Sequence, residues 1–340
     1  MRLDKKSLVD PNTPIKFQFD GVSMSGFAGD TLASALLAND VRLVARSFKY
    51  HRPRGIMSAG SEEANALVTV GFGSQQEPNI RATQLEIYDG LEVFSQNCWP
   101  SLKWDLLALN DLAAPFLTAG FYYKTFMWPK SFWEKIYEPM IRKAAGLGRL
   151  SGQANRDRYE KAFAFCDLLV IGGGPTGLIA ALQAGRAGLS VILADEDYRF
   201  GGSLNAETAH IGDVYADQWV DSIVQELSDL PNVQLMTRTT ITGAYDQGTF
   251  GALERVSKHL AFPSKELPVE CFWRIVAKRS ILASGALERF IAFPNNDRPG
   301  IMTASAVRTY INRYAVSPGR SVAIFANNDG AQQTVIDLQA

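Results

Sequence analysis

The first part of the chain alternates between apolar and polar residues. The run IKFQFDGVSMSGF, which starts at Ile15, shows this alternation on both sides of Asp20-Gly21 and predicts two strands joined by a tight turn. The next run, AGDTLASALLANDV, has apolar residues at helical spacing. Either Asp30 or Thr31 can cap this short helix, which we expect to end at about Asn39.

A later strand-like run, NALVTVG, completes the order of a β-grasp module of the ferredoxin kind, which we predict over residues 1–95. In a plant-type ferredoxin, the loop after the helix carries CxxxxCxxC, whose thiolates hold the cluster. Here that loop contains no cysteine, so we expect no cluster. It is instead basic and aromatic, which suits a phosphate, a carboxylate, a docking partner or a plain solvated surface. The residues concerned are Arg46, Phe48, Lys49, Tyr50, His51, Arg52 and Arg54.

Residues 96–160 form an aromatic-rich connector, in which four prolines between Pro100 and Pro139 exclude one long helix. So many aromatic side chains either fill a core between domains or await another chain, and we favour packing inside the protein. The polar run GQANRDR, residues 152–158, reads as a linker.

The strongest change of pattern is DLLVIGGGPTG, where a strand-like apolar run breaks into glycines. Gly172 permits a tight turn, Gly174 leaves room for a pyrophosphate, and Gly177 lets the following helix approach the sheet. The phosphates would lie at the N-terminus of that helix, beside Pro175 and Thr176. This spacing predicts a dinucleotide site; a glycine turn without a ligand is the alternative.

The residues after the glycines support a nucleotide. A helix is predicted from Thr176 to Gly188 and a strand from Ser190 to Asp195. Asp195 follows Gly172 by 23 positions, close to the spacing of about 20 expected for a carboxylate that binds ribose hydroxyls. The adjacent Glu196 is the alternative. An acid here favours NAD or FAD over NADP and leaves NAD and FAD undecided.

The dinucleotide domain is expected over residues 161–316, with a helix over 217–230 and a strand over 233–238. Two further turns are expected near the cofactor. One contains Gly202 and Ser203; the other contains Ala283, Ser284 and Gly285, for which an ordinary strand end is the alternative. Residues 317–340 begin another strand at Ser321 and a helix, the start of a second nucleotide-binding unit that the sequence leaves incomplete. We therefore expect an α/β fold, with an α+β module first, that continues into a longer polypeptide.

Composition narrows the function classes. With 46% hydrophobic residues, 20% charged residues and a net charge of −1, the chain gives no reason to expect nucleic acid or an anionic membrane as a partner. It has no signal-like apolar start and no apolar run of membrane-spanning length, so we expect a cytoplasmic protein. Its three cysteines and three histidines lie in no ligand spacing, so we predict no bound metal.

Several longer runs resemble the alpha subunit of heterotetrameric sarcosine oxidase. They are RSFKYHRPRGIMSAG, EPNIRATQLEIYDGLE, GFYYKTFMWPKSFWEKIYEP, VIGGGPTG and FPNNDRPGIM. The resemblance implies a complex that oxidatively demethylates sarcosine to glycine and forms hydrogen peroxide and methylene-tetrahydrofolate. It also implies beta, gamma and delta subunits as partners.

In this family the beta subunit carries FAD and a covalent FMN, with the FMN near the alpha–beta interface, and the alpha subunit carries NAD. Carried over by motif, the NAD contacts are Gly172, Gly174, Gly177 and Asp195. The family's C-terminal tetrahydrofolate domain has no counterpart in these 340 residues. We expect the chemistry to lie in a partner and assign no catalytic residue here. The alternatives are an FAD-dependent amino-acid or opine dehydrogenase subunit and a non-catalytic nucleotide-binding scaffold.

Overall fold

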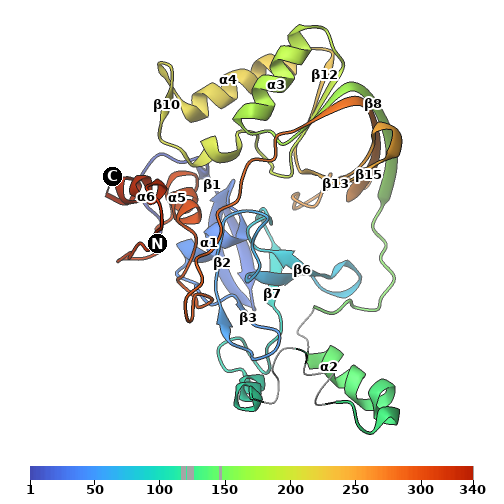
Figure 1. Ribbon diagram of the computed structural model, residues 1–340, viewed down its shortest axis with the longest axis vertical. Coiled ribbons are helices and arrows are strands. Elements are labelled where there is room, and N and C mark those ends of the chain that lie inside the picture. The colour runs from blue at the N-terminus through green and yellow to red at the C-terminus, as the bar shows by residue number, and fades with distance from the viewer. Residues whose placement is uncertain (116–119, 121–125, 145–147, 340) are drawn as a thin grey trace.

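The computed structural model describes residues 1–115, 120, 126–144 and 148–339. These residues build a smaller sheet from the N-terminal part and a larger sheet from the second half, one beside the other (Figure 1). No helix in the described ranges has the length and apolar character needed to cross a membrane.

The smaller sheet has the β-grasp arrangement. Its strands are β1 (Asp10–Phe19), β2 (Val22–Ala28), β5 (Leu67–Val70), β6 (Glu77–Arg81) and β7 (Leu91–Ser95). They lie in the order β2-β1-β7-β5-β6, with β1 parallel to β7 and the other neighbours antiparallel. The minor elements of this region are helix α1 (Leu32–Ala38), the short strands β3 (Ala45–Arg46) and β4 (Pro53–Arg54), and the 3-10 turn η1 (Gly73–Gln75).

The expected hairpin and helix are both confirmed. Asp20 and Gly21 have φ angles of 49° and 77°, as a tight two-residue turn requires. Thr31 is the N-cap of α1, and its hydroxyl accepts from the Ser34 backbone N–H. Asp30, the other candidate cap, is instead buried in an ion pair with Arg2.

The core of this module includes residues from the other end of the chain. Phe17, Leu32 and Leu36 are almost fully buried, and Tyr310 and Tyr314 pack in the same cluster. The two tyrosines belong to helix α5 (Ala304–Asn312) and the residues just after it. A stretch expected within the dinucleotide domain thus completes the β-grasp core.

The larger sheet combines parallel and antiparallel strands. They are β8 (Tyr159–Ile171), β9 (Val191–Ala194), β12 (Val233–Met236), β13 (Thr239–Tyr245), β14 (Thr249–Arg255) and β15 (Glu270–Leu282). Their order is β12-β9-β8-β15-β14-β13; the first four are parallel and the last two run antiparallel to their neighbours.

Helices α3 (Pro175–Arg186) and α4 (Ala216–Asp229) lie together over the parallel end of this sheet (Figure 1). The predicted strand–helix–strand order is therefore observed, with bounds shifted by a few residues. The remaining elements of this half are η6 (Gly202–Ala206), β10 (His210–Ile211), β11 (Val214–Tyr215), η7 (Asp246–Gly248) and α6 (Gly330–Gln339).

The aromatic connector does not pack as expected. It forms short pieces, in agreement with its prolines: η2 (Leu106–Ala113), η4 (Lys130–Phe132), the π-helical turn η5 (Trp133–Tyr137) and α2 (Glu138–Ala144). Helix α2 stands away from both sheets (Figure 1). Trp104 and Trp128 remain 74% and 82% exposed, so packing inside the protein is wrong for these two side chains. Phe116, Phe121, Tyr122 and Tyr123 lie outside the described residues.

The strand predicted from Ser321 is also wrong. Residues 321–327 are irregular, and Phe325 is 69% exposed. A strand needs a neighbour for its backbone hydrogen bonds, and within the described residues none lies beside this segment. The helix that follows does form, and its Asp337 accepts from Arg308 of α5 at 2.7 Å.

A largely buried ion pair joins the two halves. The Arg313 guanidinium donates two hydrogen bonds to Asp197, at 2.5 and 2.9 Å, and lies over the ring of Tyr198. Arg313 follows α5 in the β-grasp core, whereas Asp197 follows β9 of the larger sheet. Tyr198 adds a second link, since its hydroxyl donates to the Gly29 carbonyl oxygen at 2.6 Å.

We predict that Arg313→Met lowers the free energy of unfolding by about 3 kcal/mol, because it leaves the largely covered Asp197 carboxylate without its partner. Arg186→Met is the matched control, since Arg186 makes a similar two-point pair with Glu226 on the exposed surface. Its effect should be too small to resolve. Denaturant unfolding measures both variants, and equal losses would contradict the role assigned to Arg313.

The same pair predicts a pH dependence. Burial alone would raise the pKa of Asp197, but the charge and hydrogen bonds of Arg313 outweigh burial and hold it below its ordinary value. The pair's stabilisation is therefore complete above the unfolded pKa of about 3.9 and is lost as the pH falls through the lower folded value. The stability difference between the native protein and Arg313→Met should accordingly shrink below about pH 4. A constant difference down to pH 2 would disprove this.

Candidate functional site

The glycine-rich turn links the end of β8 to the start of α3. Gly172 has a φ of 102°, and a Cβ there would lie 2.5 Å from the Ala283 carbonyl oxygen. A Cβ on Gly177 would lie 1.8 Å from the Gly172 carbonyl oxygen. Backbone packing therefore demands both glycines, in agreement with the turn and helix-approach roles that the spacing predicts.

Gly174 is different, because no nearby protein atom would clash with a Cβ at this position. A Cβ there would find nothing closer than the Gly202 Cα, at 4.0 Å, and its φ of −71° suits any residue. Gly174 is the N-cap of α3, has no side chain to bond the first helical N–H groups, and is followed by Pro175. The open space and the free N–H groups of the first turn, which includes Thr176, are the features that an anionic group needs.

Asp195 closes one side of this turn. One carboxylate oxygen accepts from the Gly173 N–H at 2.6 Å, and the other accepts from the Asp197 N–H at 2.8 Å. Burial raises the pKa of this carboxyl despite these hydrogen bonds. Glu196 instead lines a separate cavity of about 60 Å³ that faces the β-grasp module. Of the two acids, Asp195 is the one beside the glycines.

The two further turns singled out in the sequence also lie here. The Gly201 N–H donates to the Gly173 carbonyl oxygen at 2.8 Å, and a Cβ on Gly202 would lie 2.9 Å from the Gly174 Cα. Ser203 continues this turn into η6. On the opposite side, the Ala283 N–H donates to the Ile171 carbonyl oxygen at 2.8 Å.

Ser284 lies beside the first glycine, since its Cα would be 3.2 Å from a Cβ on Gly172. Gly285 has a φ of 70° and open space around it. The structure thus brings the predicted residues into one region, with Glu196 as the exception.

The basic loop is fastened within the protein. Arg46 donates to the Leu102 carbonyl oxygen at 2.7 Å, and Arg52 and Arg54 both pair with Asp297, at 2.8 and 3.0 Å. These guanidinium groups are therefore engaged in holding the loop.

His51 adds to this fastening. Its Nδ1 lies 2.7 Å from a carboxylate oxygen of Asp105, and both side chains are buried. Lys49 and Tyr50 stack on each other through a cation–π contact. The loop is thus a structural joint, and this use of its charges was not apparent from the sequence.

The cysteines do not form a metal or redox centre in the described part of the chain. Cys98, Cys166 and Cys271 are all free, and no group of three or more potential ligands meets at one point among the described residues. Burial raises the pKa of Cys166 to about 11, so it remains a thiol at neutral pH.

Two family profiles match the chain. The 2Fe-2S iron-sulfur cluster binding domain family matches residues 12–98, and the FAD dependent oxidoreductase family matches residues 167–256. The first range contains a single cysteine, Cys98, so it lacks the four thiolates that hold a ferredoxin cluster. The second range contains the glycine turn and Asp195, and the chain therefore carries an oxidoreductase domain.

Similar proteins match over the whole chain. The sarcosine oxidase subunit alpha of Rhizobium meliloti (strain 1021) is 59% identical over 339 residues, which are 100% of this chain and 34% of that protein. The subunit alpha of Corynebacterium sp. (strain U-96) is 36% identical over 94% of this chain and 29% of that protein. This chain thus spans about a third of the length of the relatives that it matches.

Among solved structures, L-proline dehydrogenase from P. horikoshii has a TM-score of 0.64 at 20% identity, over 100% of this chain and 54% of that one, which shows a shared fold. The sequence matches confirm the resemblance found in the motifs: over its whole length, this chain is similar to about a third of the alpha subunit of sarcosine oxidases.

Proposed function

We propose that this chain is the NAD-binding part of the alpha subunit of a sarcosine oxidase complex. The observation that carries the proposal is the 59% identity to such a subunit along the entire chain. The glycine turn supports it physically, because it combines two glycines required by packing with one, Gly174, that faces open space. A ligand is the reason to keep that space free.

The residues of the turn have separate parts in this proposal. The pyrophosphate lies at the N-terminus of α3, where Gly174, Pro175 and Thr176 present backbone to it. The Asp195 carboxylate binds the adenosine ribose, and its bonds to Gly173 and Asp197 fix its orientation. The backbones of Gly202–Ser203 and Ala283–Gly285 border the two sides. A bound nicotinamide or flavin would supply two-electron hydride chemistry.

The oxidation of sarcosine belongs, in this proposal, to the whole complex. The beta subunit carries FAD and FMN, with the FMN near its interface with alpha, and gamma and delta complete the assembly. Glycine, hydrogen peroxide and methylene-tetrahydrofolate are the products. We assign no catalytic residue to this chain. Its exposed tryptophans, among them Trp104 and Trp128, suit contacts with such partners.

We also propose four functional regions. Residues 1–95 form a β-grasp module that has lost its cluster, residues 96–160 a connector, residues 161–316 the dinucleotide domain and residues 317–340 the start of a second unit. In this view the former cluster loop acts as a joint, since Arg52 and Arg54 hold it to Asp297.

A second function has its own support. The profile that matches residues 167–256 describes FAD dependent oxidoreductases, so FAD in place of NAD at the glycine turn would make the chain part of a flavin dehydrogenase for an amino acid or an opine. Asp195 suits both cofactors, because each presents a ribose with free hydroxyls.

The absorbance spectrum of the purified chain distinguishes the two cofactors. We predict a colourless protein that binds NAD in calorimetry, since the proposal leaves the flavins on the beta subunit. The control is the same chain co-expressed with beta, which should be yellow. A flavin spectrum from the chain alone would replace NAD by FAD at this site.

We further predict that Gly174→Val weakens NAD binding by more than about tenfold and leaves the melting temperature nearly unchanged, because the side chain would enter the ligand space, where its Cβ finds no protein atom closer than the Gly202 Cα at 4.0 Å. Gly177→Ala is the contrasting variant. Its Cβ would meet the Gly172 carbonyl oxygen, so it should destabilise the fold by about 3 kcal/mol or more. Unchanged NAD affinity in a folded Gly174→Val protein would refute the placement of the ligand.

A further inference from the structure

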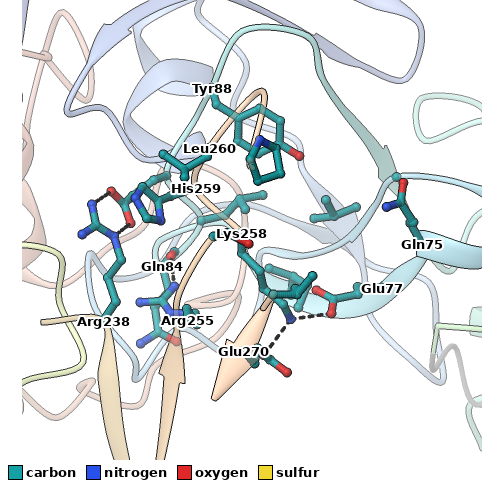
Figure 2. A pocket seen from close by; sticks show the side chains of 18 of the residues that line it. Gln75, Glu77, Gln84, Tyr88, Arg238, Arg255, Lys258, His259, Leu260 and Glu270 are labelled. Atoms are coloured by element: carbon teal, nitrogen blue, oxygen red, sulfur yellow. Dashed lines mark hydrogen bonds and ion pairs between the residues drawn. The ribbon is translucent and has the colours of Figure 1, made fainter. Parts of the chain in front are cut away.

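A second cavity, of about 430 Å³, lies between the two halves of the protein. One wall is β6 of the β-grasp module with the loop that follows it, and the other is β14 with the long loop from residue 256 to 269 (Figure 2). Its volume is within the range of roughly 300–1,000 Å³ typical of small-molecule sites. None of the residues assigned to the dinucleotide lines it.

The cavity contains equal numbers of positive and negative side chains. Its ionisable lining residues, His259 and Tyr88 apart, are Arg81, Arg238, Arg255, Lys258, Glu77, Glu86, Asp157 and Glu270. These charges are not mixed evenly. Arg238 and His259 lie together on one side, whereas Lys258 lies with Glu77 and Glu270 on the other (Figure 2).

The first side has an excess of positive charge. Arg238 makes a two-point ion pair with Glu86, at 2.7 and 2.6 Å. Arg255 has no carboxylate partner among the described residues; it donates to the backbone oxygens of Gln84 and Glu196, at 2.8 and 2.7 Å. Two guanidinium groups thus face one carboxylate.

His259 adds an unused polar atom to this side. Its Nδ1 is buried without a hydrogen-bond partner in the described structure. Burial, aided by Arg238, lowers the pKa of the ring, so His259 is neutral at physiological pH. A buried polar atom of this kind is costly unless a ligand or water satisfies it.

The opposite side has an excess of negative charge. The Lys258 ammonium contacts the carboxylates of both Glu77 and Glu270, the latter at 2.7 Å. Burial alone would lower the pKa of Lys258, but the two carboxylates outweigh burial and raise it, so Lys258 is charged. The single positive charge of Lys258 is therefore shared by two carboxylates. The net charge of this group is negative, so it can attract another cation.

Apolar side chains also line the cavity. Leu85, Leu253, Leu260 and Val269 contribute to the lining, and Tyr88 adds a hydroxyl. From this arrangement we propose that the cavity binds an amino acid in its zwitterionic form, with an apolar side chain. Its carboxylate meets Arg238, Arg255 and His259, and its ammonium group meets Glu77 and Glu270. This site goes beyond the dinucleotide function and does not depend on it.

The test uses L-leucine and two analogues that each lack one charge, 4-methylpentanoate and 3-methylbutylamine. Calorimetry is performed on the protein purified together with its partner subunits. We expect L-leucine to bind at least about tenfold more tightly than either analogue, because each analogue leaves one charged side unmatched. No heat of binding at millimolar L-leucine, or equal affinity for 4-methylpentanoate, overturns the proposal.

Variants then assign the binding to this cavity. Glu270→Gln should lower the affinity for L-leucine about tenfold and leave that for 4-methylpentanoate unchanged, because only the ammonium contact is lost. Glu160→Gln is the matched control, since Glu160 pairs with Arg158 on the exposed part of β8, outside the cavity. Leucine binding that is insensitive to Glu270→Gln belongs to another site and overturns the proposal.

A cavity-filling variant keeps the test decisive if Glu270→Gln fails to fold. Leu260→Trp adds bulk from the loop, where Leu260 is 37% exposed, and should abolish leucine binding. NAD binding, measured in the same variant, should remain. Loss of both L-leucine and NAD binding would indicate that the variant is misfolded. The comparison of L-leucine with 4-methylpentanoate and 3-methylbutylamine on the native protein then tests the proposal by itself.

Discussion

The buried contact between Arg313 and Asp197 determines how the two halves of this protein meet. It joins Arg313, the residue before Tyr314 of the β-grasp core, to the segment after β9 that carries Asp195. Asp197 also donates its N–H to Asp195, so the same short segment orients the proposed ribose carboxylate. The Arg313 side chain is buried and the Asp197 side chain is only 29% exposed, so water screens the pair weakly and removing one partner leaves the other charge uncompensated. The proposed nucleotide turn and the second cavity both depend on this docking.

Those parts of the fold that arise from neighbouring residues were predictable. The Asp20-Gly21 turn, the start of helix α1 and the glycine turn each depend on local conformation, and each is observed where its pattern predicted it, with Thr31 rather than Asp30 as the cap. The two errors concern contacts with distant partners. Ser321 begins an apolar run that suits a strand, yet a strand exists only beside another. The exposed Trp104 and Trp128 make the same point, since aromatic content does not reveal what an aromatic residue will face.

In the candidate site, too, the features set by neighbouring residues were predictable and those set by distant contacts were not. Spacing along the chain was enough to find Gly172, Gly174 and Gly177, but not to choose between Asp195 and Glu196, because the choice depends on which carboxylate turns toward the Gly173 N–H. No pattern in the sequence indicated the second cavity. Its two walls come from residues more than 150 positions apart, as the ion pair between Glu86 and Arg238 illustrates, and no motif spans such a gap. For the basic loop, the sequence suggested a ligand, a docking partner or a solvated surface. Its arginines instead pair within the protein, Arg52 and Arg54 with the distant Asp297.

The packing of α5 within the β-grasp core has a consequence for synthesis of the chain. Tyr310 donates to the Ser58 carbonyl oxygen at 2.7 Å, and the Leu3 and Leu8 N–H groups donate to the backbone of residues 315 and 313. The N-terminal module therefore cannot reach its final state as it leaves the ribosome. It must wait for some two hundred further residues, including the whole nucleotide turn, before its core closes. The core of the part that is made first can thus close only after residues 304–316 have been made.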